Sequence, residues 1–469
     1  MISKEHASLS NQIITVPSSW LNKGEYRFDA SFYCGEAVKS HLIIDKYENN
    51  IESTKKYTKE IFYPGRLKRV WSNKKKGEPF FTGAQILQSY PQTNKYINPS
   101  KIKNLDSYRV KQNTLLITRS GTIGNLTIVK GVLDKKLVTE DAIRVITKKE
   151  EDIGFLYAYL KSSIGNPLIQ QSVFGAVIDH LEPKHIESIK IPIIKEEIKR
   201  QISNSIKIVF QLRDDANKLI DNATNEFYKE TSLEKVEFDD PKLYEYENKI
   251  WTNFDFSEKL RLDGSYYNPL NALIIKNIKN KLKNYERLGE KNKIFELPTY
   301  KRIYLKKENG VPFLSGKNLM EANFQDLKYL SKIPFGKKIN EYLIHEGSIL
   351  VTMRGTCGNS RLIDKSLEGY GASHNILRIF PNQNEYHSGY IYIFLWSDYG
   401  KIQIESKILG SVVDVLTPED CSDVIIPKVN YGIQKSIGEK AKKAFELRAE
   451  ASKIEEETID LLKKEINSI

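Results

Sequence analysis

The sequence contains an internal duplication, and this feature constrains the fold more than any other. Residues 27–33 read RFDASFY and residues 261–267 read RLDGSYY. Residues 115–125 read LLITRSGTIGN and residues 349–359 read ILVTMRGTCGN, so both pairs are 234 positions apart (261 − 27 and 349 − 115). This period far exceeds the roughly 20–50 residues of solenoid repeats and matches a whole domain plus a connector. We therefore expect two similar domains.

Two further segments keep the same order in both halves. Residues 79–83 read PFFTG and residues 312–316 read PFLSG. A spaced set returns with an offset of 235 (410 − 175): Gly175, Asp179, Leu181, Pro183 and Pro192 become Gly410, Asp414, Leu416, Pro418 and Pro427. Since the offset drifts so little over most of each half, the two domains are expected to share one topology.

Composition restricts the class of partner. The chain carries 72 Lys and Arg against 60 Asp and Glu among 469 residues, a net charge of +12. This excess favours an anionic partner such as nucleic acid. Cys34, Cys357 and Cys421 are too few and too scattered for a disulfide framework, which indicates a reducing, cytoplasmic compartment. Because no apolar run approaches a signal or spanning segment, we expect no membrane partner.

Each globular part is followed by a segment that predicts a long helix. Residues 196–230 and 434–465 contain no proline and only one glycine, Gly438. Small and apolar residues step by three and four along both segments, which is typical of helices that pair along a seam. Roughly 35 residues give a rod of about 50 Å. The predicted seam consists of Leu212, Ala216, Leu219, Ala223, Leu447, Ala451, Ile454 and Leu461.

These patterns predict an α+β fold in which two similar globular domains alternate with two long helices. The helices are expected to pair as an antiparallel coiled coil, with the globules at its opposite ends and related by a pseudo-twofold axis. The expected boundaries are 1–193 for the first globule, 194–231 for its helix, 232–248 for a linker, 249–428 for the second globule and 429–469 for its helix.

A search for catalytic motifs finds no match. Residues 310–318 resemble a phosphate loop, but five residues separate its glycines where four are needed, and Asn318 replaces the Ser or Thr that binds Mg²⁺. The fragment YNPL at residues 267–270 lacks the second proline and the aromatic residue of amino-methyltransferases. His180 and His185 have no Cys or His group to complete a zinc site. We therefore expect no catalytic residue, metal or cofactor.

The glycine-containing turns at 121–125 and 355–359 are the sharpest local repeats. Such turns can let a phosphate or a base edge approach the backbone, with Ser120, Thr122 and Thr356 nearby. Arg119 and Arg354, beside the turns, are the stronger candidates for DNA contacts. The alternative is a purely structural corner that fixes each domain core.

Basic residues gather around aromatic residues at equivalent places in both halves. In the first half they surround Trp71, and in the second they surround Tyr300 and Tyr304. They can neutralise phosphates, while Gln85 or Asn318 could read base edges. The alternative is a solvated loop, which is less expected when the cluster occurs twice. The basic residues are Arg66, Lys68, Arg69, Lys74, Lys75, Lys76, Lys301, Arg302, Lys306 and Lys307.

The doubled turn element, the GxxVxxLxP-like element before an Ile-Pro strand, and the helix after each globule resemble the specificity (S) subunit of Type I restriction–modification systems. The resemblance covers nearly the whole chain, although Met353 precedes Arg354 where the first copy has Arg119. It implies that each globule reads one half of a split, asymmetric site in double-stranded DNA. It also implies that the helices set the spacing and dock two methyltransferase (modification) subunits, and through them restriction subunits. This subunit is non-catalytic in that family.

Three other hypotheses stay open from the sequence. The chain could serve another methyltransferase-based phage-defence complex, which its co-purified partners would reveal. It could be a divergent stand-alone DNA methyltransferase, which binding of S-adenosylmethionine would support. A purely helical scaffold is disfavoured by the repeated basic loops.

Overall fold

The computed structural model describes residues 18, 35–171, 180–236, 261, 264–324, 327–410 and 413–468. The repeat at 27–33, Cys34, Gly175, Asp179 and residues 237–248 of the expected linker lie outside the described residues. We call residues 35–192 lobe 1 and residues 264–427 lobe 2.

Lobe 1 combines short helices with short strands. Its strands are β1 (Ile51–Ser53), β2 (Thr58–Phe62), β3 (Trp71–Ser72), β4 (Glu78–Phe81), β5 (Tyr96–Ile97), β6 (Leu115–Thr118), β7 (Leu126–Ile128), β8 (Leu137–Val138), β9 (Ala142–Thr147) and β10 (Lys190–Pro192). Its α-helices are α2 (Glu36–Asp45), α3 (Thr54–Tyr57), α4 (Gly83–Ile86), α5 (Asp152–Lys161), α6 (Gly165–Gln171) and α7 (Pro183–Glu187), with 3₁₀ turns at Pro99–Lys101, Leu105–Tyr108 and Gly131–Leu133.

Lobe 2 repeats this order. Its strands are β11 (Tyr285–Arg287), β12 (Lys293–Phe295), β13 (Tyr304–Leu305), β14 (Val311–Leu314), β15 (Lys328–Leu330), β16 (Ile349–Thr352), β17 (Ser360–Leu362), β18 (Gly371–Ala372), β19 (Ile376–Phe380) and β20 (Ile425–Pro427). Its α-helices are α10 (Pro269–Lys281), α11 (Leu288–Lys291), α12 (Ile339–Tyr342), α13 (Ser388–Trp396), α14 (Asp398–Lys407) and α15 (Pro418–Ser422). Its 3₁₀ turns are Lys307–Asn309, Gly316–Met320, Ile333–Lys338 and Lys365–Leu367.

The two lobes share one sheet topology, which confirms the predicted α+β duplication. In lobe 1 the strand orders are β2-β9-β6-β7, β3-β5-β4-β8 and β1-β10; in lobe 2 they are β12-β19-β16-β17, β13-β15-β14-β18 and β11-β20. A parallel pairing also recurs in each lobe, as β4 with β8 and β14 with β18. The repeated apolar segments form β6 and β16, which are buried along their whole length because helices and neighbouring strands cover both faces.

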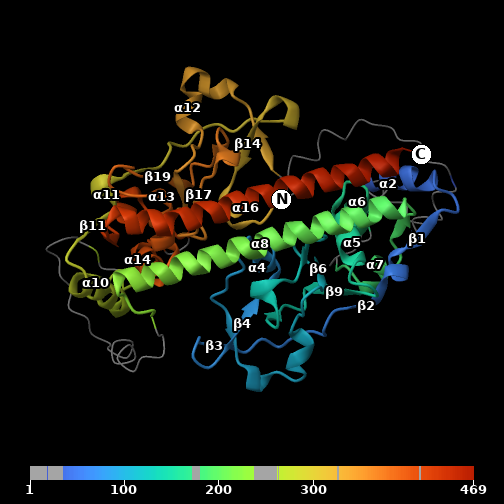
Figure 1. Ribbon diagram of the computed structural model, residues 1–469, viewed down its shortest axis with the longest axis horizontal. Helices are drawn as coiled ribbons and strands as arrows, with labels where there is room; N and C mark the ends of the chain where they lie inside the picture. The colour runs from blue at the N-terminus through green and yellow to red at the C-terminus, as the bar shows by residue number, and fades with distance from the viewer. Residues whose placement is uncertain are drawn as a thin grey trace.

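Two long helices run beside each other along the long axis of the molecule: α8 (Glu196–Thr231) and α16 (Tyr431–Asn467) (Figure 1). Their contacts pair rising numbers on α8 with falling numbers on α16, so the helices are antiparallel. Arg213 bonds Glu455, Asn217 accepts a hydrogen bond from Arg448, and Glu226 pairs with Lys440. This arrangement confirms the predicted helix pair.

Small residues let the two helices approach where the pseudo-twofold axis crosses them. Ala216 and Ala451 are equivalent in the repeats and both are fully buried, as is Ala223. The other predicted seam residues are only partly buried, since the sides of the helices also receive the lobes: Leu212, Leu219, Leu447, Ile454 and Leu461.

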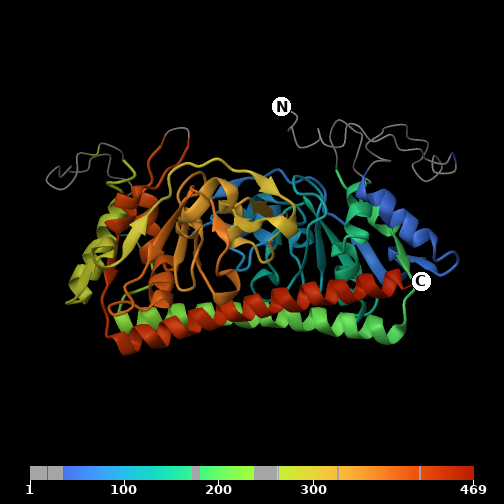
Figure 2. The same ribbon diagram turned by 90° about the horizontal axis from the view of Figure 1, so that it is seen from above.

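Each lobe rests on one end of the helix pair, and both lobes lie on the same face of it (Figure 2). The core of lobe 1 includes Ala451, Leu462 and Ile466 from α16, while the core of lobe 2 includes Ile220 and Phe227 from α8. Each lobe therefore completes its core with the helix that follows the other lobe. The lobes also meet above the middle of the pair, which the predicted placement at opposite ends did not include.

A glycine crossing joins each lobe to its own long helix. A Cβ on Gly389 of α13 would lie 2.2 Å from the Gly438 carbonyl oxygen of α16, and one on Gly154 would lie 2.6 Å from the Ser203 carbonyl oxygen of α8. We expect Gly389→Ala to lower the free energy of unfolding by about 1–3 kcal/mol, because the two backbones must separate. Gly65→Ala, with nothing within 4 Å of the new atom, is the control. Denaturant midpoints measure both; equal midpoints would contradict the close crossing.

Candidate nucleic-acid interface

We call the sheets β3-β5-β4-β8 and β13-β15-β14-β18 the distal sheets of lobe 1 and lobe 2. The distal sheet of lobe 1 carries an exposed aromatic residue on its edge strand. Trp71 of β3 is 50% exposed. Its ring meets Phe80 edge-to-face at 6.0 Å between centroids, and Lys95 Nζ lies 5.9 Å from its centroid. The turn that follows contains Lys74, Lys75 and Lys76, all exposed, and is closed by a hydrogen bond from the Lys76 backbone N–H to Asn73 Oδ1 (3.0 Å). We call residues 66–77 the basic segment of lobe 1.

Lobe 2 has the same arrangement at the equivalent place. Tyr304 of β13 is 39% exposed and meets Phe313 edge-to-face at 6.1 Å, with Lys328 Nζ 4.9 Å from its centroid. Lys301, Lys306 and Lys307 are exposed around it, and Lys307 Nζ lies 3.6 Å from Glu456 Oε1 of α16. Residues 299–310 form the basic segment of lobe 2. An exposed aromatic residue among cations suits contact with nucleic acid.

Each basic segment contains an arginine, and the two arginines lie in different electrostatic settings. Arg69 Nη2 lies 3.0 Å from Glu140 Oε1 and 3.4 Å from Asp141 Oδ2. The equivalent Arg302 instead bonds Ser373 Oγ (3.2 Å) and His374 Nδ1 (2.8 Å). Burial, aided by Arg302 and Arg354, lowers the pKa of His374, so this ring is neutral near pH 7. Two carboxylates therefore offset the charge of Arg69, whereas the contacts of Arg302 leave its charge in place.

The remaining basic residues of the basic segment of lobe 1 are also at the surface. Arg66 and Lys68 are exposed on the segment that leads into β3. Together with the lysine turn they form a basic strip along the edge of the distal sheet.

The repeated glycine turns are closed by their own hydrogen bonds. Thr118 Oγ1 accepts from the Asn125 N–H (3.1 Å), and the Gly124 N–H bonds the Thr118 carbonyl oxygen (2.9 Å). Thr352 makes the same bonds with Asn359 and Gly358. Gly124 and Gly358 both have a φ of +86°, which favours glycine. The structure thus supports the structural interpretation of these turns.

The two arginines beside the turns occupy different environments. Arg119 is 6% exposed; its Nε donates to the Leu181 carbonyl oxygen (3.0 Å), its Nη2 to Glu182, and its guanidinium covers the Tyr63 ring at 3.8 Å. Its equivalent is the buried Met353, since Leu181 and Leu416 bond the carbonyl oxygens of Arg119 and Met353. Arg119 therefore joins the turn to the Leu181 segment, and its buried side chain is not accessible to DNA. Arg354, equivalent to the half-buried Ser120, is exposed.

The two candidates for base reading are used as local caps. Gln85 Oε1 accepts from the Thr82 N–H (2.9 Å). Asn318, 5% exposed, accepts from the Ser315 N–H (2.8 Å) and donates to Glu321 (2.9 Å). Both polar ends of Asn318 are therefore occupied, and it is left out of the proposed interface.

A cavity of about 680 Å³ lies between the lobes and the helix pair, where the pseudo-twofold axis passes. Both glycine turns face it through Thr122 and Thr356, and so do Arg302 and Arg354. A cavity of this size suits a small molecule and cannot enclose a DNA duplex. The basic segments lie at the edges of the distal sheets. They are therefore the better candidate surface for DNA.

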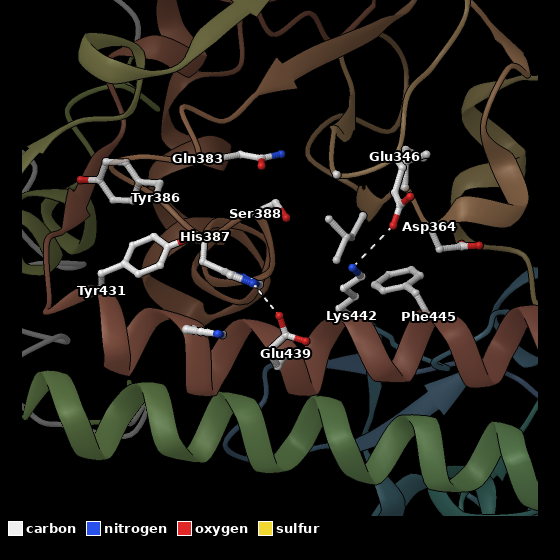
Figure 3. Close-up of a pocket in the computed structure, with 14 residues that line it drawn as sticks. Glu346, Asp364, Gln383, Tyr386, His387, Ser388, Tyr431, Glu439, Lys442 and Phe445 are labelled. Atoms are coloured by element: carbon white, nitrogen blue, oxygen red, sulfur yellow. Dashed lines mark hydrogen bonds and ion pairs between the residues drawn. The ribbon is translucent and has the colours of Figure 1, made fainter.

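Two further cavities occupy equivalent places between each lobe and its own long helix. The one in lobe 2, about 410 Å³, is bounded by α16 and the start of α13 (Figure 3). There His387 Nε2 lies 3.1 Å from Glu439 Oε1, and Lys442 Nζ lies 3.5 Å from Glu346 Oε1. The one in lobe 1, about 430 Å³, is lined by Lys207 and Phe210, the equivalents of Lys442 and Phe445. The duplication thus presents one groove twice.

No group of three or more metal-binding side chains occurs among the described residues. Over the same part of the chain, no helix is long and apolar enough to cross a membrane.

The family model of the Type I restriction modification DNA specificity domain matches this chain twice, over residues 43–226 and 283–460. The chain belongs to this family. Each match contains one lobe core and most of its long helix. The duplication is therefore a duplication of the specificity domain itself, as the resemblance implied.

Solved structures of this class are similar to the chain over most of its length. The Type I restriction–modification S subunit from M. genitalium is 13% identical, with 89% of this chain and 94% of that one covered and a TM-score of 0.32. The HsdS subunit from Thermoanaerobacter tengcongensis is 12% identical, with 90% and 97% covered and a TM-score of 0.27. No curated protein matches the chain. The family assignment rests on the two specificity-domain matches.

Proposed function

We propose that this specificity-family chain reads a bipartite site in double-stranded DNA, with each lobe reading one half. The observation that carries the proposal is the pair of basic segments, each with an exposed aromatic residue and a lysine beside its ring, at equivalent positions of the two lobes. Lysines there would neutralise phosphates, which supplies affinity without sequence preference. Sequence would then be read by neighbouring side chains that differ between the lobes.

The proposed site is asymmetric. A pseudo-twofold axis presents the two lobes to a duplex in opposed orientations, and identical lobes would read a palindrome. The lobes differ in the basic segments and beside their arginines. Trp71 stands where lobe 2 has Tyr304, and Glu140 stands where lobe 2 has His374. These differences support two different half-sites.

We also propose that the helix pair and its flanking grooves dock two methyltransferase subunits, and through them restriction subunits. The support is the equivalent groove beside each long helix, since two equivalent surfaces suit two copies of one partner. The chain itself is proposed to be non-catalytic, because no methyl-donor or nucleotide-binding motif is found in its sequence.

A lobe exchange tests this function. Replacing residues 1–190 with those of a relative of different specificity should change one half of the methylated motif and leave the other half and the spacer intact. Mapping methylated bases in cells that carry the complete system measures this. The unmodified chain is the control. If both halves change together, the lobes do not read the site separately.

A further inference from the structure

The two lobes are joined directly across the pseudo-twofold axis. The Ser89 N–H bonds the Met320 carbonyl oxygen (2.8 Å), and the Ala322 N–H bonds the Leu87 carbonyl oxygen (3.1 Å). Leu87 and Ser89 are the repeat equivalents of Met320 and Ala322, so each bond is the symmetry mate of the other. Between them Gln88 faces Glu321 in an antiparallel bridge.

The residues after this bridge reach into the opposite half of the molecule. Tyr90 donates a hydrogen bond to Asp221 Oδ1 of α8 (2.7 Å) and packs edge-to-face on Trp396 of lobe 2 at 5.2 Å. Burial, and then its bond to Asp221, raise the pKa of Tyr90, so the phenol stays protonated and keeps donating. Gln92 Oε1 accepts from Lys401 Nζ of α14 (3.0 Å).

The equivalent segment of lobe 2 reaches back in the other direction. Asn323, the equivalent of Tyr90, accepts a hydrogen bond from Arg213 of α8 (2.6 Å) and lies 3.5 Å from Ser452 Oγ of α16. Each loop is thus held by the helix pair beneath it as well as by the other loop. We call residues 87–92 and 320–323 together the clasp.

We propose that the clasp fixes the distance and orientation between the lobes, with Tyr90 as a positioning residue that sets the spacer between the half-sites. This inference rests on the proposed function. The helix pair limits how far apart the ends of the lobes lie, but each lobe could still tilt about its end. The clasp removes that freedom, because it joins the lobes on the axis, at a point above the helices. It stays closed while both half-sites are read.

The first test removes the side-chain contacts of Tyr90. We expect Tyr90→Ala to leave both half-sites unchanged and to reduce the preference for the wild-type spacer over one a base pair longer or shorter by roughly tenfold, since the bond to a carboxylate and the ring contact each contribute on that scale. Tyr90→Phe keeps the ring contact with Trp396 and should lie between. Methylated-site mapping in cells with the complete system gives the spacer distribution. A folded Tyr90→Ala chain with an unchanged spacer preference overturns the proposal.

The second test locks the clasp. Gln88 and Glu321 form a non-hydrogen-bonded antiparallel pair, with Cα atoms expected about 4.5 Å apart. This lies within disulfide range, so the Gln88→Cys, Glu321→Cys chain should cross-link. Each single substitution is the control for disulfides with native cysteines. The oxidised complex is expected to bind and methylate the wild-type site with the wild-type spacer. If oxidation abolishes binding and a reductant restores it, the clasp must open on DNA and the proposal is overturned.

The outcomes of these tests separate a failure of the clasp proposal from a failure of the proposed function. If the wild-type complex marks no bipartite motif, the proposed function fails and the clasp proposal falls with it. If the wild-type complex marks such a motif and the Tyr90 or locked variant gives the contrary result above, only the clasp proposal is overturned.

Discussion

Glu455→Gln is expected to lower the free energy of unfolding by about 3–5 kcal/mol, because it removes a carboxylate that pairs with a buried arginine and a largely buried lysine. Glu455 of α16 lies 3.0 Å from Arg213 Nη2 and 3.0 Å from Lys161 Nζ, and it accepts a hydrogen bond from the Tyr157 hydroxyl. Its side chain is 5% exposed. The amide would leave Arg213 and Lys161 charged and uncompensated beside the helix pair.

The effect should depend on pH. Although burial alone would raise it, the pKa of Glu455 is lowered from 4.5 to about 2, chiefly by Arg213 and then Lys161. A carboxyl with a depressed pKa contributes stability that is complete above its unfolded value and is lost as pH falls towards its folded value. The difference between wild type and Glu455→Gln should therefore be full at pH 7 and shrink from about pH 4.5 downward.

Denaturant unfolding of the full chain at several pH values measures this difference. Glu457→Gln is the matched control: it makes the same charge change two residues away, where the side chain is 65% exposed and 3.9 Å from Lys453. Surface pairs of this kind contribute about 0–1 kcal/mol. If Glu455→Gln costs no more than its control, the buried network is not what holds the helices in register.

Changing Lys74, Lys75 and Lys76 together to Ala is expected to weaken binding to every DNA sequence. Each lost phosphate contact should reduce the slope of log affinity against log salt by up to about 0.9, hence by up to about 2.7 for three. Because phosphate contacts carry no sequence information, the preference for the cognate site should change little. Titrations of the assembled complex with cognate and unrelated duplexes at several salt concentrations measure both quantities.

A charge-matched control separates local contact from net charge. Lys39, Lys46 and Lys56 are exposed, lie in lobe 1 outside its basic segment, and do not line the groove beside α8. Changing these three to Ala removes the same charge and should leave the salt slope nearly unchanged. An equal loss of affinity and of salt slope in both triple variants would mean that the basic segment acts only through the net charge of the whole protein.

The tertiary structure changed the interpretation of individual residues more than that of the fold. Arg119 and Arg354 have similar neighbours in sequence, yet Arg119 is buried against Leu181 and Tyr63 whereas Arg354 is exposed. Asn318 was a candidate for base reading, but its side chain caps its own turn. A side chain's type states which bonds it can make, and only packing decides whether those bonds are made within the protein.

The amino-acid sequence by itself determined the duplication, the α+β class and the two long helices. These features are periodic: a nearly constant offset between the copies and apolar steps of three and four are visible along the chain. The tertiary structure alone decided the clasp and the buried network around Glu455. Ser89 and Met320 are 231 positions apart (320 − 89), and Arg213 and Glu455 are 242 apart. Such pairs leave no periodic pattern, because the folded packing of both lobes on one helix pair brings them together.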